Sequence, residues 1–270
     1  MPSFKYRGHN LSYELRGKGK RPVVLLHGLL LNRKMDSQLA DELAERGNRV
    51  ILLDLLGHGD SDRPRDLSKY SMSIYGEEVI ALLDHLKIDE AVIGGTSLGA
   101  NTTLEAACAA PERVRGLILE MPVLDNALLA CALIFTPALV ALTFGAPLAK
   151  AVAAVASRIP RGSHTVVDMA LDSFSQDPRP ASAMLQGLFF GRVAPPSEQR
   201  RQIEAPAIII GHPRDVIHPF SDSQMLAREL PRGRLIEADS VVELRFRPKR
   251  LTNEIAGFLN ECWRQTRSST

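Results

Sequence analysis

Short apolar runs and amphipathic segments alternate along most of the 270-residue chain. Apolar runs of about four to eight residues bounded by Gly or Pro are typical of buried strands, whereas apolar residues spaced about three or four apart favour helices. This alternation predicts the α/β class, with a mostly parallel, doubly wound sheet covered on both faces. We expect an edge hairpin over residues 5–16, strands over residues 23–26, 50–53, 91–93, 114–119, 207–210 and 234–236, and helices over residues 36–46, 75–86, 100–109, 219–230 and 248–263.

One long stretch breaks this alternation, because no strand pattern occurs between Glu120 and Ala207. Residues 127–149 carry no charge, which is enough length for a membrane span of about 20 apolar residues. Pro137 lies within that run, so we expect an apolar helix or helix pair and no membrane span. The predicted domains are a core of residues 1–121 and 198–270 and an inserted helical cap of residues 122–197, called the cap segment below.

The overall composition excludes some partners. A formal net charge of +2 is too small to favour nucleic acid. The three cysteines, Cys108, Cys131 and Cys262, lie far apart and match neither a metal spacing nor a disulfide framework. We therefore expect no metal site. Odd, scattered cysteines and the lack of an apolar stretch near Met1 favour a cytoplasmic location.

The segment Gly95-Thr-Ser-Leu-Gly99 lies between an expected strand and an expected helix. A serine on such a sharp turn exposes its Oγ above the sheet, with a helix N-terminus beneath it. A Cβ at Gly95 or Gly99 would clash where the turn packs closely. The turn therefore predicts Ser97 as a nucleophile, and the alternative is an ordinary serine that caps the helix.

Further motifs stand in a matching order: His27-Gly28, then Asp54-Leu-Leu-Gly-His-Gly-Asp-Ser61, then a loop around Asp215 after the strand over 207–210. With these motifs the chain, over about residues 4–263, resembles the α/β-hydrolase fold superfamily with a helical cap. The resemblance implies cofactor-free acyl chemistry through a serine, an acid and a histidine, in that order along the chain.

The resemblance also implies roles for single residues. Asp215 takes the place of the acid, with Asp125 as an alternative acid, although Asp215 also fits a turn residue that caps the next helix. The amides of Leu98 and Leu29 take the place of the oxyanion-binding donors. His27 and His58 take structural places in their loops.

The expected catalytic histidine is missing, because no histidine follows His218. Alignment of the last strand and helix puts Glu243 near its place. A carboxylate beside Asp215 would repel it, and one of the two pKa values would rise. Glu243 is therefore either a base of raised pKa or an ion-pair partner of Arg245 or Arg247.

His218 is the other candidate for the base, three residues after Asp215. The loop that follows the acid skirts the nucleophile in this fold, so the ring could approach Ser97. The short spacing counts against its orientation by Asp215, and a loop histidine bonded to backbone is an equal alternative. His212 is a weaker option.

The cap segment bears on the ligand, because it holds most of the aromatic side chains. They are Phe135, Phe144, Phe174, Phe189 and Phe190. An apolar pocket suits a small hydrophobic substrate or ligand.

Two hypotheses on function follow from these residues. The first is a serine hydrolase of small apolar esters, thioesters or lactones that forms an acyl-enzyme on Ser97 with an atypical or impaired base. The alternative is a non-catalytic ligand-binding protein on the same scaffold. An exposed apolar cap face would indicate a homodimer.

Overall fold

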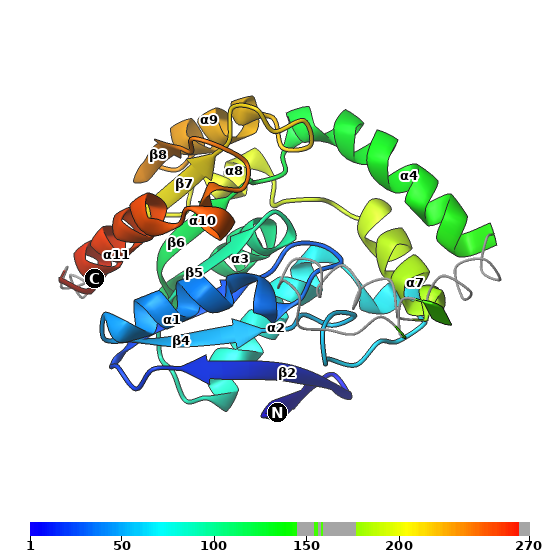
Figure 1. The fold of residues 1–270 in the computed structure, drawn as a ribbon, viewed down its shortest axis with the longest axis horizontal. Helices are drawn as coiled ribbons and strands as arrows, with labels where there is room; N and C mark the ends of the chain where they lie inside the picture. Colours follow the sequence, from blue (N-terminus) through cyan, green and yellow to red (C-terminus); the bar gives the residue numbers. More distant parts are fainter. Residues whose placement is uncertain (145–153, 156–157, 159–176, 265–270) are drawn as a thin grey trace.

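A single eight-stranded sheet forms the centre of the computed structural model, which describes residues 1–144, 154–155, 158 and 177–264 (Figure 1). The strand order is β1-β2-β4-β3-β5-β6-β7-β8. The strands are β1 (Ser3–Tyr6), β2 (His9–Arg16), β3 (Arg21–Leu26), β4 (Asn48–Leu53), β5 (Ala91–Thr96), β6 (Val114–Glu120), β7 (Ala207–Gly211) and β8 (Gly233–Glu237).

The expected hairpin is found at the edge of this sheet, where β1 and β2 run antiparallel. β2 is also antiparallel to β4, with Tyr13 opposite Leu53. From β4 to β8 every neighbouring pair is parallel. The carboxyl ends of these parallel strands therefore meet at one edge of the sheet, where sites in open α/β sheets form.

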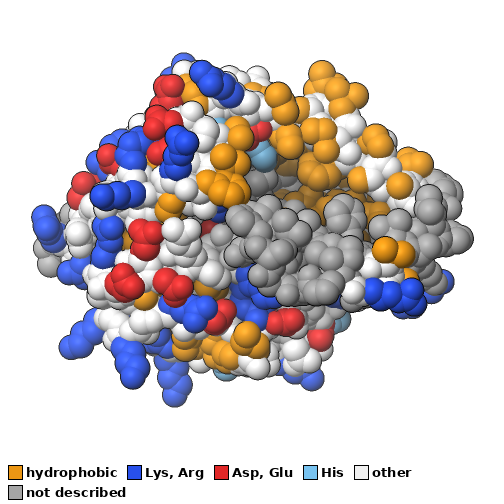
Figure 2. Space-filling view, in the orientation of Figure 1, with side chains coloured by type: hydrophobic (Ala, Val, Ile, Leu, Met, Phe, Trp, Pro, Cys, Tyr) orange, Lys and Arg blue, Asp and Glu red, His pale blue; other side chains and the backbone are white. Residues whose placement is uncertain are grey.

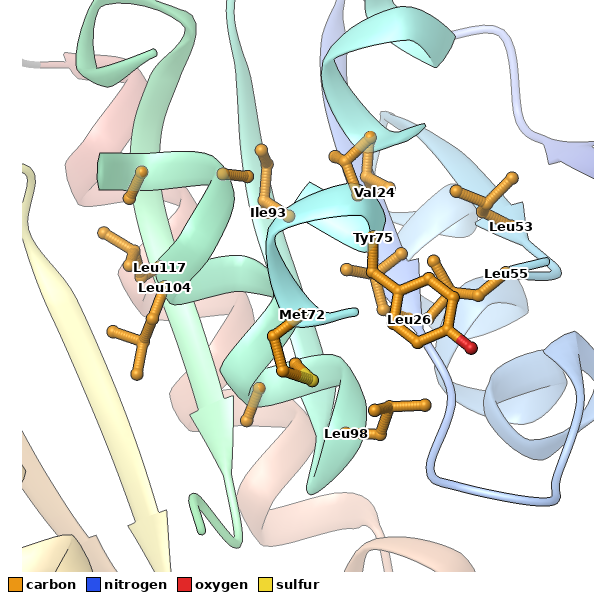
Figure 3. Packing of buried hydrophobic residues seen from close by; sticks show 14 of the residues in the cluster. Val24, Leu26, Leu53, Leu55, Met72, Tyr75, Ile93, Leu98, Leu104 and Leu117 are labelled. Carbon is orange, nitrogen blue, oxygen red and sulfur yellow. The ribbon is translucent and has the colours of Figure 1, made fainter. Parts of the chain in front are cut away.

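Helices cover both faces, as the apolar strands predict (Figure 1). One face packs against α2 (Met72–His85) and α3 (Leu98–Ala109), and the other against α1 (Ser37–Glu45) and α11 (Lys249–Arg264). All six residues of β5 are buried, because they face a helix layer on either side. Figure 3 shows Met72, Tyr75 and Leu98 packed with the sheet residues of the first layer. Leu98 thus joins the core to the turn that carries Ser97.

In the cap segment the structure describes two long helices, α4 (Leu128–Phe144) and α7 (Pro178–Phe189), which pack against each other (Figure 1). The Oγ atoms of Thr143 and Ser182 join them at 2.9 Å. Pro137 lies inside α4 and does not end it, so the run expected as a helix or helix pair is one helix up to Phe144. The rest of the uncharged run, residues 145–149, lies outside the described residues.

The outer face of α4 is apolar and exposed. Within the described residues, one helical stretch, Asp125–Thr143, is long and apolar enough to cross a membrane by length and composition alone, and 6% of it is buried. Leu129 and Leu133 on α4 are 72% and 69% exposed. Figure 2 shows hydrophobic side chains gathered over this helix. A single helix of this kind is weak evidence for a membrane span.

Candidate active site

Ser97 lies on a strained turn between β5 and α3. Its φ is +54°, a left-handed conformation that non-glycine residues rarely adopt. A Cβ on Gly95 would come within 2.5 Å of the Gly99 carbonyl carbon, and one on Gly99 within 2.1 Å of the Leu26 carbonyl oxygen. Ser97 precedes the first turn of α3, yet its side chain makes no capping hydrogen bond. The Oγ is therefore left free for another partner, which argues against the ordinary capping role.

That partner is His218. Its Nε2 lies 2.9 Å from Ser97 Oγ, and its Nδ1 lies 2.8 Å from Asp215 Oδ2. A carboxylate only accepts, so Nδ1 carries the proton that it donates to Asp215. Nε2 is then the acceptor for the Ser97 hydroxyl, which is the tautomer that a general base requires. The structure thus brings three residues expected at the site, Ser97, His218 and Asp215, into one hydrogen-bonded chain.

The short spacing between Asp215 and His218 is compatible with this geometry because the loop turns back on the acid. Asp215 Oδ1 accepts hydrogen bonds from the amides of Ile217, at 2.8 Å, and His218, at 3.0 Å. Burial raises the pKa of Asp215, but the hydrogen bonds from the His218 ring and from these amides outweigh it, so the pKa is lowered overall. Asp215 is therefore both the turn residue and the ionised partner of the histidine.

Glu243 is committed elsewhere. Its carboxylate accepts from Arg250 Nε and Nη2, both at 2.8 Å, and from the Asp239 amide at 2.6 Å. Burial raises the pKa of Glu243, but the hydrogen bonds from Arg250 and Asp239 lower it overall. The expectation that Glu243 pairs with Arg245 or Arg247 is wrong, because Arg250 holds it. A carboxylate in this state is a poor base.

Arg245 instead reaches the turn beneath the nucleophile. Its Nη2 donates to Thr96 Oγ1 and to Glu120 Oε2, both at 2.8 Å, and lies 3.4 Å from Asp36 Oδ1. The backbone carbonyl of Glu120 also accepts a hydrogen bond from the Ser97 amide, at 2.9 Å. Burial raises the pKa of Glu120, but the charge of Arg245 and the further lowering effects of His212 and Thr96 together outweigh it and bring that pKa to about 2. The strained turn therefore rests on an ionised pair.

His212, the weaker candidate for the base, belongs to this buried group. Its Nδ1 lies 2.8 Å from the Ser240 carbonyl oxygen, and its Nε2 lies 3.4 Å from Glu120 Oε1. Both ring nitrogens thus face groups other than Ser97. Sequence reasoning missed Glu120 and Asp36 as supports of the nucleophile turn, because residues so far apart in the chain carry no local pattern.

The expected oxyanion donors flank Ser97. Leu98 is the first residue of α3, where an amide has no acceptor within the helix. In the part of the chain that the structure describes, neither the Leu98 nor the Leu29 amide has a hydrogen-bond acceptor. His27 holds the Leu29 loop, since its Nδ1 lies 2.8 Å from the Gly28 carbonyl and its Nε2 accepts from the Leu55 amide at 3.2 Å. The two amides are therefore free for a ligand.

A pocket opens above Ser97 between the sheet and the two helices of the cap segment. The empty space within it, counted together with its opening to solvent, is about 740 Å³. Its described lining holds no Asp, Glu, Lys or Arg. The lining residues are Leu29, Met72, Ser97, Leu98, Asn101, Val123, Cys131, Phe135, Leu139, Leu185, Leu188, Phe189, Val193 and His218.

The aromatic residues of the cap segment divide between the pocket and the surface. Phe135 and Phe189 line the pocket, but Phe190 is 78% exposed and points elsewhere. Phe174 and the side chain of Phe144 lie outside the described residues. Asp125, the alternative acid, is exposed, and the carboxylate at the histidine is that of Asp215. The described residues hold no cluster of three or more His, Cys, Asp or Glu that could bind a metal.

Known proteins resemble this chain in sequence and in fold. The family model for the alpha/beta hydrolase fold matches residues 21–176. The dihydrolipoyllysine-residue acetyltransferase component of the acetoin cleaving system from Pseudomonas putida is 43% identical over 109 residues, 40% of this chain and 28% of that protein. The chain matches less than half of the length of its curated relatives.

Two solved structures have a similar fold. The enol-lactonase from Burkholderia xenovorans LB400 superposes with a TM-score of 0.77 at 24% identity, covering 96% of this chain and 100% of that one. A thermophilic esterase from Thermogutta terrifontis gives a TM-score of 0.74 at 21% identity, covering 96% and 97%. At these identities the likeness is one of fold.

Proposed function

Because the chain belongs to the α/β-hydrolase fold family, we propose that it is a serine hydrolase of small apolar esters, thioesters or lactones. The observation that carries this proposal is the chain of hydrogen bonds from Ser97 Oγ through His218 to Asp215, at 2.9 and 2.8 Å. A ligand-binding protein would need neither a strained serine nor a histidine bonded to it. The base is atypical in its position, and its geometry supports a working base rather than an impaired one.

The first half of the reaction acylates the serine. Ser97 Oγ attacks the carbonyl carbon of the substrate while its proton passes to His218 Nε2. The oxygen that becomes negative lies toward the Leu29 and Leu98 amides, which stabilise it without reorganisation. The tetrahedral intermediate then collapses, the bond to the leaving alcohol or thiol breaks, and His218 returns the proton to that group. In a lactone the leaving hydroxyl stays attached to the acyl chain.

The second half releases the acyl group. His218 Nε2 removes a proton from a water molecule, and the hydroxyl attacks the acyl carbon of the ester on Ser97. The same amides hold the second oxyanion, the bond from carbon to Ser97 Oγ breaks, and His218 gives its proton back to the serine. Throughout, the ionised Asp215 stabilises the imidazolium and keeps its orientation.

The pocket defines the class of substrate. Its described lining is apolar apart from Ser97, Asn101 and His218, and a charged acyl group would find no partner there, which is costly in a buried site. The names of the structural neighbours, an enol-lactonase and an esterase, agree with an acyl ester or lactone. We therefore propose an uncharged hydrophobic acyl group.

Two further parts of the proposal concern the whole protein. The exposed apolar face of α4 suits a contact between two copies of the chain, so we propose a homodimer. We also propose a cytoplasmic location.

A fluorophosphonate probe tests the proposal, because it reacts only with an activated serine. We expect the wild-type protein to be labelled at Ser97, as located by peptide mass spectrometry, and to hydrolyse p-nitrophenyl butyrate. Ser97→Ala should lose both properties, whereas Ser68→Ala, at an exposed serine in the short 3-10 helix Leu67–Lys69, should keep both. A wild-type protein that binds apolar esters without labelling or turnover would favour the ligand-binding alternative. Turnover that survives Ser97→Ala would overturn the proposal.

A further inference from the structure

The carboxamide of Asn101 joins the two ends of the cap segment to the helix that carries the nucleophile. Asn101 lies one turn into α3, and its amide donates to the Ser97 carbonyl at 3.0 Å. Its Nδ2 donates to the carbonyl of Val123, at 2.7 Å, where the chain leaves the core, and to that of Val193, at 2.6 Å, where the chain returns. Its Oδ1 accepts from the Val123 amide at 3.1 Å.

These bonds fix the orientation of the carboxamide and use its hydrogens completely. The NH₂ group has two hydrogens, and each goes to a different end of the cap segment. The reversed orientation would place Oδ1 against two carbonyl oxygens, so the network determines which atom is which. Asn101 is 2% exposed, and a buried amide that loses its partners is not compensated by water. The two ends therefore cannot separate without leaving buried polar groups unpaired.

Other buried side chains hold one end each. Asp222 on α9 (Phe220–Glu229) accepts from the Leu124 amide at 2.8 Å and from the Ala127 amide at 3.1 Å, at the outgoing end. Glu105 on α3 accepts two hydrogen bonds from Arg192 at the returning end, with Nε at 2.8 Å. Among these three anchors, Asn101 alone contacts both ends, so it ties the outgoing and the returning chain to one point of α3.

We call the hydrogen bonds of the Asn101 carboxamide to Val123 and Val193 the clasp. All three residues also line the pocket, so the clasp lies in the wall that the substrate meets. We propose that Asn101 is a positioning residue that pins both ends of the cap segment together and so sets how far the walls on α4 and α7 stand from Ser97. That distance decides how large an acyl group the pocket accepts. The consequence for specificity rests on the proposed hydrolase function, whereas the clasp itself does not.

Asn101→Asp tests the clasp, because a carboxylate has the same shape but no hydrogens to give to the two carbonyls. Thr103→Val is the matched control, since Thr103 is equally buried on α3 and bonds only within the helix, to the Gly99 carbonyl at 2.9 Å. Hydrogen exchange followed by mass spectrometry reports on residues 121–127 and 190–195, and hydrolysis of p-nitrophenyl acetate and octanoate reports on acyl size.

In Asn101→Asp we expect exchange at both ends to quicken about tenfold. We also expect the preference between the octanoate and acetate esters to shift about tenfold, mainly through KM. Thr103→Val should change neither. Exchange that is unchanged at both ends, or an equal loss with both esters, would overturn the proposal. If Asn101→Asp does not fold, Asn101→Ser, which keeps one donor, takes its place. A wild-type protein that hydrolyses neither ester would refute the hydrolase function, and the exchange result would still decide the clasp.

Discussion

The segments that follow β7 and β8 reach the same nucleophile turn but contribute different groups to it. After β7, Asp215 and His218 form a hydrogen-bonded relay that ends at Ser97 Oγ. After β8, where the family order places the histidine, Arg245 supports the turn from beneath and Glu243 is bound by Arg250. One segment presents a proton acceptor and the other presents only fixed charges.

The difference shows what a triad requires of a fold. It requires a histidine within hydrogen-bond reach of a serine and of a carboxylate, and it does not require three separate loops. The tight turn in which Asp215 accepts from the Ile217 and His218 amides places the proposed acid and the proposed base within four consecutive residues. If His218 is the base, as we propose, the segment after β8 needs no histidine, and its Arg245 instead bonds Thr96 and Glu120 beneath the strained turn.

The largest expected effect is at the base. His218→Ala should lower kcat/KM for p-nitrophenyl butyrate on the order of 10⁴-fold, because the serine loses its proton acceptor. Steady-state kinetics at equal folded fraction measure it. Glu243→Gln is the control and should cost little activity, because the Glu243 carboxylate bonds Arg250 and the Asp239 amide and makes no contact with Ser97 or His218 among the described residues.

The same pair of positions sharpens the comparison. From the sequence alone, a histidine introduced at Glu243 should raise activity. In the structure the side chain at position 243 faces Arg250 and the Asp239 amide. We therefore expect the double variant His218→Ala/Glu243→His to be as inactive as His218→Ala alone. Wild-type kcat/KM in His218→Ala, or restored activity in the double variant, would mean that the segment after β8 supplies the base.

The second expected effect is on stability. Arg245→Met leaves the Glu120 carboxylate, which is 3% exposed, without its cation, and a stranded buried charge costs about 3–5 kcal/mol. Urea unfolding measures this loss. Arg234→Met is the control, because its ion pair with Glu261 is exposed at 3.5 Å and such pairs contribute about 0–1 kcal/mol. The double variant Arg245→Met/Glu120→Gln should recover part of the lost free energy of unfolding, because it removes the stranded charge. Equal losses in Arg245→Met and Arg234→Met would show that Arg245 does not stabilise the nucleophile turn.

The sequence predicted the layers of the fold because each strand and helix has a local pattern. The continuous apolar runs gave buried parallel strands, and the Gly95–Gly99 turn located Ser97. The sequence also singled out Asp215 and His218. It did not reveal that their side chains would contact each other, because that contact depends on a turn whose amides donate to Asp215.

What the sequence could not predict are contacts between distant segments. Arg245 and Glu120 meet across 125 positions of the chain, and Asn101 reaches Val193 across 92. No spacing rule connects such pairs, since they are neighbours only because the sheet places them together. The exposed position of Phe190 was missed for a different reason, because a single aromatic residue carries no sequence pattern that distinguishes a pocket wall from a surface.

The smallest expected effect depends on pH and concerns the far side of the Arg245 support. Burial raises the pKa of Asp36 from 3.8 to about 6, against the lowering effect of Arg245 and with a further rise from Glu120. The folded protein thus holds this proton more tightly than the unfolded chain, so the stability that it contributes is present below about pH 4 and is lost as the pH rises through about 6. Asn at this position cannot ionise. We therefore expect Asp36→Asn to gain stability relative to wild type between about pH 4 and pH 7, by on the order of 3 kcal/mol in full. Urea unfolding of both proteins across this range measures the difference. Because the pKa of Glu120 is about 2, that residue titrates below this range. A difference between the two proteins that does not change with pH would show that Asp36 is ionised throughout, and that the Arg245 support carries two carboxylates rather than one.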